Sequence, residues 1–402
     1  MMQLVDICEL IVDCEHKTAP TESAGYPSIR TPNIGRGSFI LDGVNLVSEE
    51  TYQVWTRRAV PQPGDLIMAR EAPVGNVAMI PDGLRPCLGQ RTLLIRPNRS
   101  KVEPSFLNYF LNGPLVQGLI HAKTNGVTVP HLNMKDVRTM DLPTLPPLAV
   151  QRRIAHILSA YDELIENNQR RIRLLEAMAR ALYREWFVHF RFPGHETLPR
   201  VTSPLGDIPQ GWEVKRVPEC FDINPRVVVP RDGEKPFVPM GCLTNDSMLI
   251  TDIESRDRNS GAKFQNGDTL FARITPCLEN GKTGFVQFLP DAQAVACGST
   301  EFIVLRSRTL TPECVYLLAR SDEFRGNAIK SMSGATGRQR VQERCFDDFN
   351  IAHPPRALLD RFSAIVAPSF RMIQKLHLQI QNLRRTRDLL LPRLLSGQVS
   401  LS

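Results

Sequence analysis

The sequence lacks the patterns that mark disulfide-bonded, zinc-binding and membrane-spanning proteins. Its nine cysteines form no Cys-x-x-Cys pair, and nine is an odd number. A disulfide framework or a zinc site is therefore not expected, and reduced thiols are typical of cytoplasmic proteins. No apolar run approaches the roughly 20 residues that a membrane-spanning helix requires. The first residues, MMQLVDICEL, also lack the basic and apolar segments of a signal peptide. We therefore expect a cytoplasmic protein.

Motifs for catalysis, cofactors and metals are missing as well. The sequence contains no G-x-G-x-x-G motif for a dinucleotide or methyl-donor cofactor and no H-E-x-x-H motif for zinc. The segment CLENGKTG ends like a phosphate-binding loop, but Pro276 stands where the first glycine is required. The tripeptide at 15–17, Glu-His-Lys, resembles part of a metal-dependent nuclease motif without a convincing acidic partner upstream. We therefore predict no catalytic residue, no metal site and no cofactor in this chain.

What the sequence does contain is an internal repeat. The recurring segments are PQPGDLIMAREAP and FQNGDTLFARITP at 61–73 and 264–276, TLLIRP and FIVLRS at 92–97 and 302–307, TNGVTVPHL and MSGATGRQR at 124–132 and 332–340, and the double prolines 146–147 and 354–355. In this alignment Arg70 corresponds to Arg273, and Thr128 corresponds to Thr336. Because the segments keep the same order, they indicate a diverged duplication rather than chance similarity.

Each repeat is followed by a long helical pattern. After the first double proline, apolar residues from Ile154 to Trp186 recur in alternating steps of four and three, which is the seam of a coiled coil. A second seam of equal length lies 208 residues later, from Phe362 to Leu394. One narrow apolar stripe cannot be buried by a single helix, so we predict that the two helices pair within the chain as an antiparallel coiled coil. Asn168, the polar residue of the first seam, either fixes the register of the pair or faces water.

The regions before the helices alternate short buried strands with short helical segments, which favours an α+β fold. The chain is therefore expected to divide into a first domain (1–149), a central helix (150–192), a linker with a second domain (193–356) and a C-terminal helix (357–402). Two similar domains separated by a rod of paired helices have the geometry of a caliper, which measures a distance.

The charge distribution narrows the choice of binding surface. The net charge of +7 arises from the helices, because 150–192 and 357–395 together carry +8 while the rest of the chain is nearly neutral. A basic cluster stands out at 325–344, RGNAIKSMSGATGRQRVQER. Guanidinium, amide, hydroxyl and backbone N–H groups in one loop are the groups that bind phosphates and base edges of DNA. A solvated surface loop is the alternative reading of this segment.

Four segments resemble a known family over essentially the whole chain. The segments LPPLAVQRRIAHIL, REWFVHFRFPGHE, IPQGWEVKRV and LLLPRLLSGQVSL are similar to those of the specificity subunit of Type I restriction–modification enzymes. The resemblance implies two target recognition domains that each read one half of a split, asymmetric DNA sequence. It also implies that the two helices set the gap between the half-sites. The second copy departs from the pattern at PPRALLDRF, which lacks the Gln-Arg-Arg of the first.

The same resemblance implies the partners and cofactors. The helices would dock two methyltransferase (M) subunits, and restriction (R) subunits would join the complex, which acts on double-stranded DNA. S-adenosylmethionine, ATP and Mg²⁺ would belong to these partners, so that the assembled complex, and not this chain, would be the DNA adenine methyltransferase and endonuclease. The rival hypotheses are a coiled-coil scaffold whose globular ends bind proteins and a fused enzyme, for whose methyltransferase domain 402 residues leave no room.

Candidate DNA-binding residues follow by analogy with loops of this type. They are Lys17, Arg30, Arg70, Lys123 and Thr128 in the first domain, and Arg273, Lys330, Thr336, Arg338, Gln339 and Arg340 in the second. Arg70 and Arg273 follow apolar strands at matching positions, so a structural ion pair is the alternative for both. No residue is assigned to catalysis, to a cofactor or to a metal.

Overall fold

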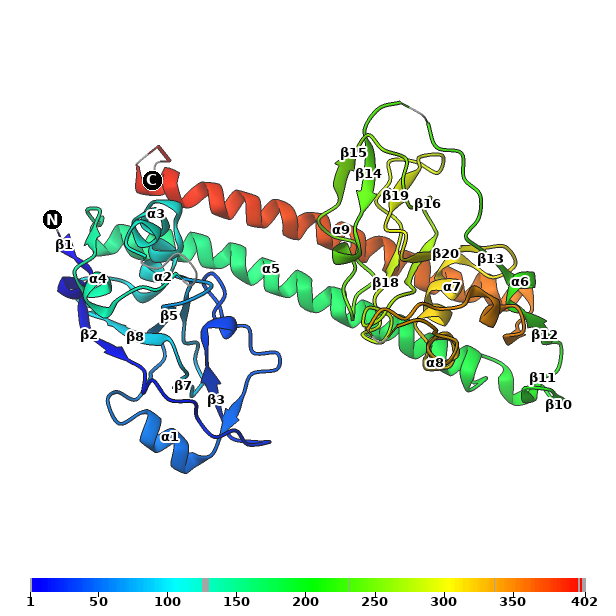
Figure 1. Cartoon of the computed structure of the whole chain (residues 1–402), viewed down its shortest axis with the longest axis horizontal. Coiled ribbons are helices and arrows are strands. Elements are labelled where there is room, and N and C mark those ends of the chain that lie inside the picture. The colour runs from blue at the N-terminus through cyan, green and yellow to red at the C-terminus, as the bar shows by residue number, and fades with distance from the viewer. Residues whose placement is uncertain (1, 125–129, 231, 336, 397, 400–402) are drawn as a thin grey trace. The chain divides into compact units, whose positions relative to one another are not determined.

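The computed structural model describes residues 2–124, 130–230, 232–335, 337–396 and 398–399. The chain forms two compact units, one comprising Met1–Ile165 with Asn382–Ser402 and the other comprising Glu166–Gln381. Each unit contains one globular α+β domain and a section of each of two long helices (Figure 1). Among the described residues, no helix combines the length and the apolar character needed to cross a bilayer.

The first domain contains two small sheets. The four-stranded antiparallel sheet has the order β2 (Cys8–Asp13), β8 (Thr92–Pro97), β5 (Leu66–Ala69), β6 (Val77–Met79), and the three-stranded sheet has the order β4 (Leu46–Val47), β3 (Tyr26–Ile29), β7 (Cys87–Leu88). The helices of this domain are α1 (Glu49–Trp55), α2 (Pro104–Asn112), α3 (Pro114–Ala122) and α4 (Met134–Arg138), and β1 (Met2–Gln3) pairs with β9 (Asp141–Leu142). Strands β5 and β8 are buried because their sequences are almost entirely apolar, and α2 covers them.

The second domain repeats this plan. Its antiparallel sheet has the order β13 (Phe221–Ile223), β20 (Phe302–Ser307), β17 (Thr269–Ala272), β18 (Thr283–Phe285), and its other sheet has the order β15 (Glu254–Arg256), β14 (Lys235–Val238), β19 (Ala296–Gly298), β16 (Ala262–Phe264). The remaining elements are the hairpin β10 (Arg200–Ser203) with β11 (Gly206–Pro209), the pair β12 (Glu213–Arg216) with β21 (Asn350–His353), and the helices α6 (Val217–Cys220), α7 (Pro312–Ala319) and α8 (Asp322–Lys330). The matching strand orders confirm the duplication that the sequence predicts.

The repeated Gly-Asp dipeptide has the same structural role in both domains. Asp268 is 1% exposed, and its carboxylate accepts two hydrogen bonds from the Arg306 guanidinium at 2.7 and 2.6 Å. The same carboxylate accepts the backbone N–H of Gln265 at 2.8 Å, which closes the turn before β17. In the first domain, Asp65 binds Arg96 at 2.9 and 2.7 Å in the same way. The motif therefore ties the turn to the neighbouring strand through a buried ion pair.

The two long helices are α5 (Leu148–Tyr183) and α9 (Arg356–Leu395), with 36 and 40 residues. The α-helical conformation of α5 ends at Tyr183, and a π-helical turn, Arg184–Val188, follows it. Every residue of the predicted seams is buried or half-buried, so the heptad pattern identified the buried face of both helices correctly.

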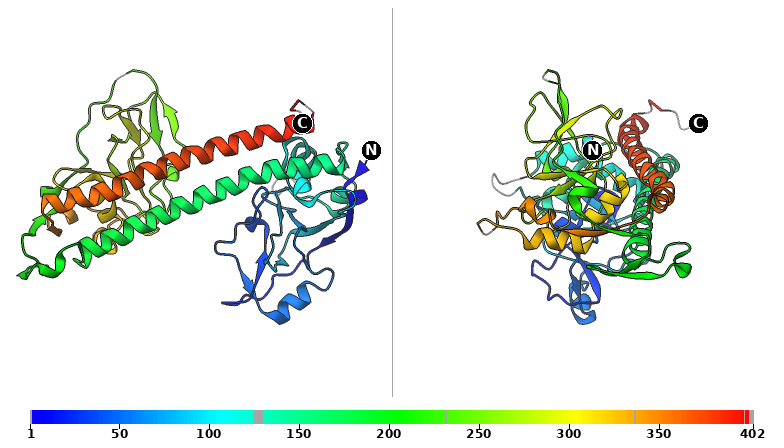
Figure 2. Two further views of the ribbon diagram at one scale, coloured as in Figure 1. Left: turned by 180° about the vertical axis from the view of Figure 1, so that it is seen from behind. Right: turned by 90° about the vertical axis from the view of Figure 1, so that its right-hand side faces the viewer.

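The sections of α5 and α9 run antiparallel in each unit (Figures 1 and 2). In the first unit, Leu158 near the start of α5 shares a core with Leu391 near the end of α9. In the second unit, the Trp186 and Phe362 rings lie 5.7 Å apart, from the opposite ends of these elements. Asn168 is 8% exposed and donates to Gln379 at 3.5 Å. Of the two alternatives for Asn168, the structure therefore supports the one in which it faces the paired helix.

Each domain is attached to the helix section of its own unit by a buried or half-buried acidic residue. In the second unit, Glu176 of α5 is 5% exposed and accepts the Ser247 hydroxyl at 2.7 Å and the Met248 N–H at 2.8 Å. Burial raises the pKa of the Glu176 carboxyl, while these hydrogen bonds act to lower it. In the first unit, Asp162 of α5 accepts hydrogen bonds from Tyr109 of the domain and from Arg387 of α9.

Candidate nucleic-acid interface

Within the basic segment at 325–344, residues 333 and 340 close a short hairpin. Ser333 and Arg340 exchange backbone hydrogen bonds of 3.1 and 2.9 Å, which define its base. Gly334 and Gly337 have φ angles of +129° and +78°, which L side chains rarely adopt, so glycine is required at these two turn positions. Arg338 is exposed near the tip: its N–H donates to the Ala335 carbonyl at 2.9 Å, and its guanidinium makes no hydrogen bond or ion pair with the residues that the structure describes.

Contacts with the end of β17 hold the base of the hairpin in place. Val341 donates its N–H to the Arg273 carbonyl at 2.9 Å, and Thr275 donates its N–H to the Gln339 carbonyl at 3.1 Å. Gln339 in turn donates its N–H to the Thr275 hydroxyl at 3.1 Å. The structure thus brings together Arg273, Gln339 and Arg340 beside one strand end, while Lys330 lies exposed at the last position of α8.

Two of these arginines form ion pairs. Arg340 donates to Glu301 at 2.7 and 2.9 Å although its side chain is 49% exposed. The hydrogen bond from Arg340 lowers the pKa of the Glu301 carboxyl. Arg273 donates to Glu343 at 2.8 Å and to the Val341 carbonyl at 3.1 Å. The structural ion pair considered for Arg273 is therefore present.

Arg70 of the first domain is more buried than Arg273 and also forms an ion pair. Its side chain is 7% exposed, and Nη1 lies 2.7 Å from both carboxylate oxygens of Asp13. Nε donates to the Leu132 carbonyl at 2.9 Å, and Nη2 lies 3.0 Å from His131 Nε2. The structural alternative for Arg70 is therefore also present. Its guanidinium positions the segment around His131.

The other first-domain candidates lie apart from this network. Lys17 is exposed in the loop after β2, Arg30 is exposed after β3, and Lys123 is half-buried at the end of α3. Among the described residues, no hydrogen bond or ion pair joins any of the three to Arg70. Thr128 and Thr336 lie outside the residues that the structure describes.

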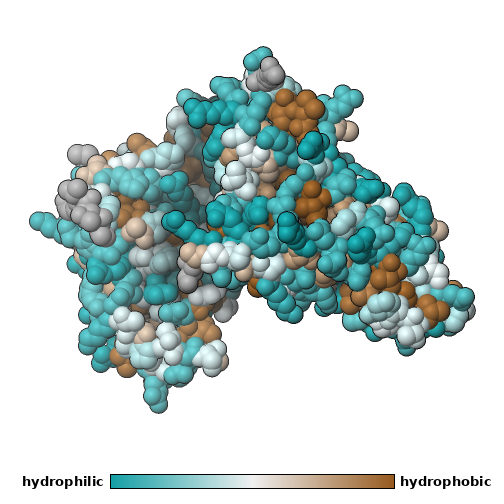
Figure 3. Space-filling view, turned by 45° about the vertical axis from the view of Figure 1, so that its right-hand side comes forward, coloured by the Kyte–Doolittle hydropathy of each residue, from teal (hydrophilic) through white to brown (hydrophobic). Residues whose placement is uncertain are grey.

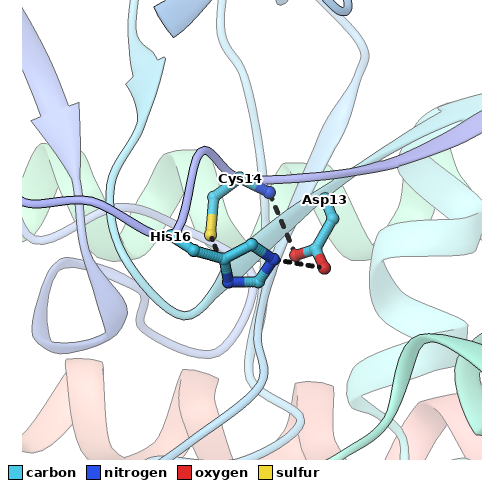
Figure 4. Close-up of side chains that lie close together, drawn as sticks. All are labelled: Asp13, Cys14 and His16. Atoms are coloured by element: carbon cyan, nitrogen blue, oxygen red, sulfur yellow. Dashed lines mark hydrogen bonds and ion pairs between the residues drawn. The ribbon is translucent and has the colours of Figure 1, made fainter.

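Asp13, Cys14 and His16 form a small cluster next to Lys17 (Figure 4). His16 Nε2 lies 2.9 Å from the Asp13 carboxylate, and the Cys14 sulfur lies 3.9 Å from His16 Nδ1. These donor atoms are close enough to hold a cation, but both oxygens of Asp13 already bind the Arg70 guanidinium. The geometry therefore favours an ion-pair network that orders the loop carrying Lys17 over a metal site.

Sequence reasoning missed two pairs of equivalent positions at which the two domains carry different side chains. The N–H of Leu132 binds the Arg70 carbonyl just as that of Val341 binds the Arg273 carbonyl, so His131 is the counterpart of Arg340. By the same criterion Arg91 is the counterpart of Glu301, because their carbonyls accept the N–H groups of Arg70 and Arg273. The alignment of the repeats could have matched Arg91 with Glu301, but it pairs His131 with Gln339, so only the structure identifies His131 as the counterpart of Arg340.

Comparison with known proteins places this architecture in a family. Residues 1–177 match the family model described as the Type I restriction modification DNA specificity domain. The chain is thus similar to specificity subunits of Type I restriction–modification systems. The MjaIX specificity subunit of Methanocaldococcus jannaschii is 23% identical over 372 residues, which cover 90% of this chain and 83% of that protein.

Two further proteins show similar relationships. The EcoEI specificity subunit of Escherichia coli is 31% identical over 156 residues, covering 37% of this chain and 26% of that protein. The crystal structure of an S subunit from M. genitalium has a TM-score of 0.59 and 12% identity, and the match covers 100% of this chain and 96% of that one. The latter similarity shows that the duplicated fold with its two long helices is shared.

Proposed function

We propose that this chain is the DNA-recognition subunit of a Type I restriction–modification complex and that each globular domain reads one half of a split target. The observation that carries the proposal is the repeated specificity-domain fold, in which the conserved frame presents diverged loops. The ion pairs Asp65–Arg96 and Asp268–Arg306 tie the same turn to the same strand in both domains, so the frame is shared. A frame that is constant and loops that differ are expected of two modules that bind the same polymer at different sequences.

The two half-sites would differ because the loops present different groups to DNA. At equivalent positions the first domain carries Arg91 and His131 where the second carries Glu301 and Arg340. An arginine prefers the two acceptors of guanine, whereas an acidic side chain accepts from the amino group of cytosine. Opposite charges at the matched positions Arg91 and Glu301 therefore support an asymmetric target.

The helix pair would carry the partners. Although soluble helices usually bury their apolar residues, the helix sections of the second unit expose Leu174, Met178, Ile365, Met372 and Leu378 at 40–66%. The sections in the first unit expose Leu164 and Leu389 at 52% and 51%. We propose that these two groups bind two methyltransferase subunits and that restriction subunits complete the complex. In this proposal S-adenosylmethionine, ATP and Mg²⁺ are bound by the partners, which supply methyl transfer and cleavage.

Sequence selection tests the proposed function. The complex of this chain with its methyltransferase subunits would be used to select duplexes from random DNA. The expected result is two different short blocks at a fixed distance, separated by base pairs of any sequence. A coiled-coil scaffold for proteins would instead select nothing, and a single continuous block would also contradict the proposal.

Substitution of Met178 is expected to weaken partner docking. Met178→Glu places a carboxylate in the exposed apolar group. Burying this charge against a methyltransferase subunit, with no opposite charge beside it, would cost several kcal/mol. We expect at least a tenfold loss of affinity for the methyltransferase subunit, measured by titration with the full-length chain. Val201→Glu is the matched control, because Val201 is 40% exposed on β10 and is expected to have no effect. Equal affinities for the two variants would place the docking surface elsewhere.

Alanine at the hairpin arginines is expected to weaken DNA binding by the assembled complex. A bidentate contact from Arg338 or Arg340 to a base would cost about 1–3 kcal/mol when lost and would relax the preference at one position of one half-site. A phosphate contact would instead give a sequence-blind loss and lower the salt slope by about one. Quantitative binding at several salt concentrations separates the two cases. If both variants keep the affinity and the slope of the wild type, the hairpin does not touch DNA.

A further inference from the structure

A cleft of about 720 Å³ lies in the second domain beside the loop that joins β13 to β14. Arg226 and Val228 of this loop line the cleft together with Lys263, Arg273 and Thr300. Three of its described lining residues are cations, and none of them is acidic. Because Arg273 is already paired with Glu343, the charges that attract an anionic group to this cleft are those of Arg226 and Lys263.

The cleft is continuous with the hairpin at 333–340. Arg273 lines the cleft and also binds the Val341 carbonyl at the foot of the hairpin. Thr300 lines the cleft next to Glu301, which holds Arg340. The Nε atom of Arg273 is buried and has no hydrogen-bond partner among the described residues. A buried donor without an acceptor is uncommon in folded proteins. An anionic ligand in the cleft would supply the missing acceptor for the Arg273 guanidinium.

The internal repeat supports a binding role for the same loop. Strand β13 lies beside β20 just as β2 lies beside β8, so the β13–β14 loop is the counterpart of the β2–β3 loop. The β2–β3 loop carries Lys17, a candidate that the sequence identified in the first domain. Its counterpart in the second domain carries Arg226, which is not among the candidates that the sequence identified.

Val228 is the most exposed apolar residue of the described chain, at 92%. On the face seen in Figure 3, apolar side chains gather in small groups on a mainly hydrophilic surface. Pro225 and Pro230 flank the valine and restrict the backbone on both sides of it. An exposed methyl-bearing side chain beside two cations matches a thymine in duplex DNA, which offers a C5-methyl group in the major groove and a phosphate on either side.

We propose that the β13–β14 loop is a second DNA-reading element of the second domain. In this assignment Val228 contacts the methyl group of a thymine in the second half-site, while Arg226 and Lys263 bind the phosphates beside it. The inference rests on the proposed function and extends it by naming residues that determine specificity. The hairpin at 333–340 and this loop then border the same cleft.

Deoxyuridine is the direct probe, because it differs from thymine only by the missing methyl group. Each thymine of the selected second half-site would be replaced in turn, and binding would be measured with the complex of the full chain and its methyltransferase subunits. One replacement is expected to weaken binding by about fourfold, the value of one buried methyl group. Val228→Ala should show the same weaker binding to thymine DNA and no further loss with that deoxyuridine. Val201→Ala is the control and should keep the wild-type response.

The phosphate contacts have a separate readout. Arg226→Ala and Lys263→Ala should each weaken binding without changing the selected sequence, and each should lower the salt slope by about one. Arg200→Ala, an exposed cation of β10 outside the cleft, should leave the slope unchanged.

The outcomes that overturn the inference are distinct from those that overturn the proposed function. A wild-type complex that selects no split sequence would overturn the proposed function. A wild-type complex that selects one, while Val228→Ala and Arg226→Ala keep its affinity, its salt slope and its deoxyuridine response, overturns only the loop assignment. A second half-site without thymine overturns the methyl contact.

Discussion

One additional heptad in each long helix is expected to widen the gap between the two half-sites by about three base pairs. Seven residues lengthen a helix by about 10.5 Å at 1.5 Å per residue. Along duplex DNA this distance corresponds to roughly three base pairs at 3.4 Å each. The half-site sequences should stay unchanged, because the loops that read them are untouched.

The positions of the insertions follow from the division of the chain. The chain passes from one unit to the other after Ile165 in α5 and after Gln381 in α9. Insertions at these two points leave every contact inside each unit intact, including those of Asp162 and Glu176. Duplicating 159–165 and 375–381 also preserves the alternating steps of four and three in both seams.

Mapping of the methylated sequences checks this prediction. Three base pairs also rotate the far half-site by about a third of a turn, so that the affinity should fall even as the gap widens. An insertion of two residues in each helix is the control, because it rotates the following part of each apolar seam by about half a turn and should prevent pairing of the helices. An unchanged gap with the heptad insertion would show that the helices do not set the spacing.

Replacement of Asp268 by alanine is expected to lower the free energy of unfolding of the second unit by about 3 kcal/mol. The reason is that the change leaves Arg306 without its partner and removes the acceptor for the Gln265 N–H. Asp268→Asn should retain the turn and lose only the ion pair, so its effect should be smaller. Urea unfolding of the full chain measures both.

Two variants make this prediction specific. Asp65→Ala should destabilise the first unit to a similar extent, because Asp65 has the same contacts there. Asp291→Ala serves as the control, since its carboxylate accepts only the N–H groups of an exposed turn. An effect of Asp268→Ala no larger than that of Asp291→Ala would mean that the buried pair does not stabilise the domain.

Periodic and repeated features of this chain could be predicted from its sequence. The steps of four and three identified both helices and the face of each that is buried, because the spacing of apolar residues follows directly from helix geometry. Comparison of the two halves identified β5 with β17 and β8 with β20, since buried strands tolerate little change. The basic segment at 325–344 was expected to contain a loop, and residues 333 and 340 close a hairpin there.

Features that depend on distant partners could not be predicted in this way. Arg70 was selected as a DNA contact, yet its partner Asp13 lies 57 positions earlier and no local pattern joins the two. Arg340 and Glu301 are likewise brought together by the bridge between the hairpin and the end of β17. The end of α5 at Tyr183 could not be predicted either, since no glycine or proline follows it directly. The helix instead widens into a π-helical turn, Arg184–Val188.

The β13–β14 loop could not be identified as a binding element from the sequence, because it has diverged from its counterpart. It shares no residue pattern with the β2–β3 loop, so only the strand order reveals that the two are equivalent. Recognition loops are expected to differ between the repeats if they read different DNA sequences. Because the loops then share no residue pattern, comparison of the two halves of the sequence cannot match them.

Replacement of the second domain by a copy of the first tests the central claim most directly. In this chimera residues 2–145 would stand in place of 210–353, which keeps the 208-residue offset and both long helices. The complex of the chimera with its methyltransferase subunits would be used to select duplexes from random DNA, in parallel with the wild type. If each domain reads its own half-site, the chimera should select the first half-site at both ends of the target and lose the second. Retention of the second half-site by a folded chimera would contradict the account.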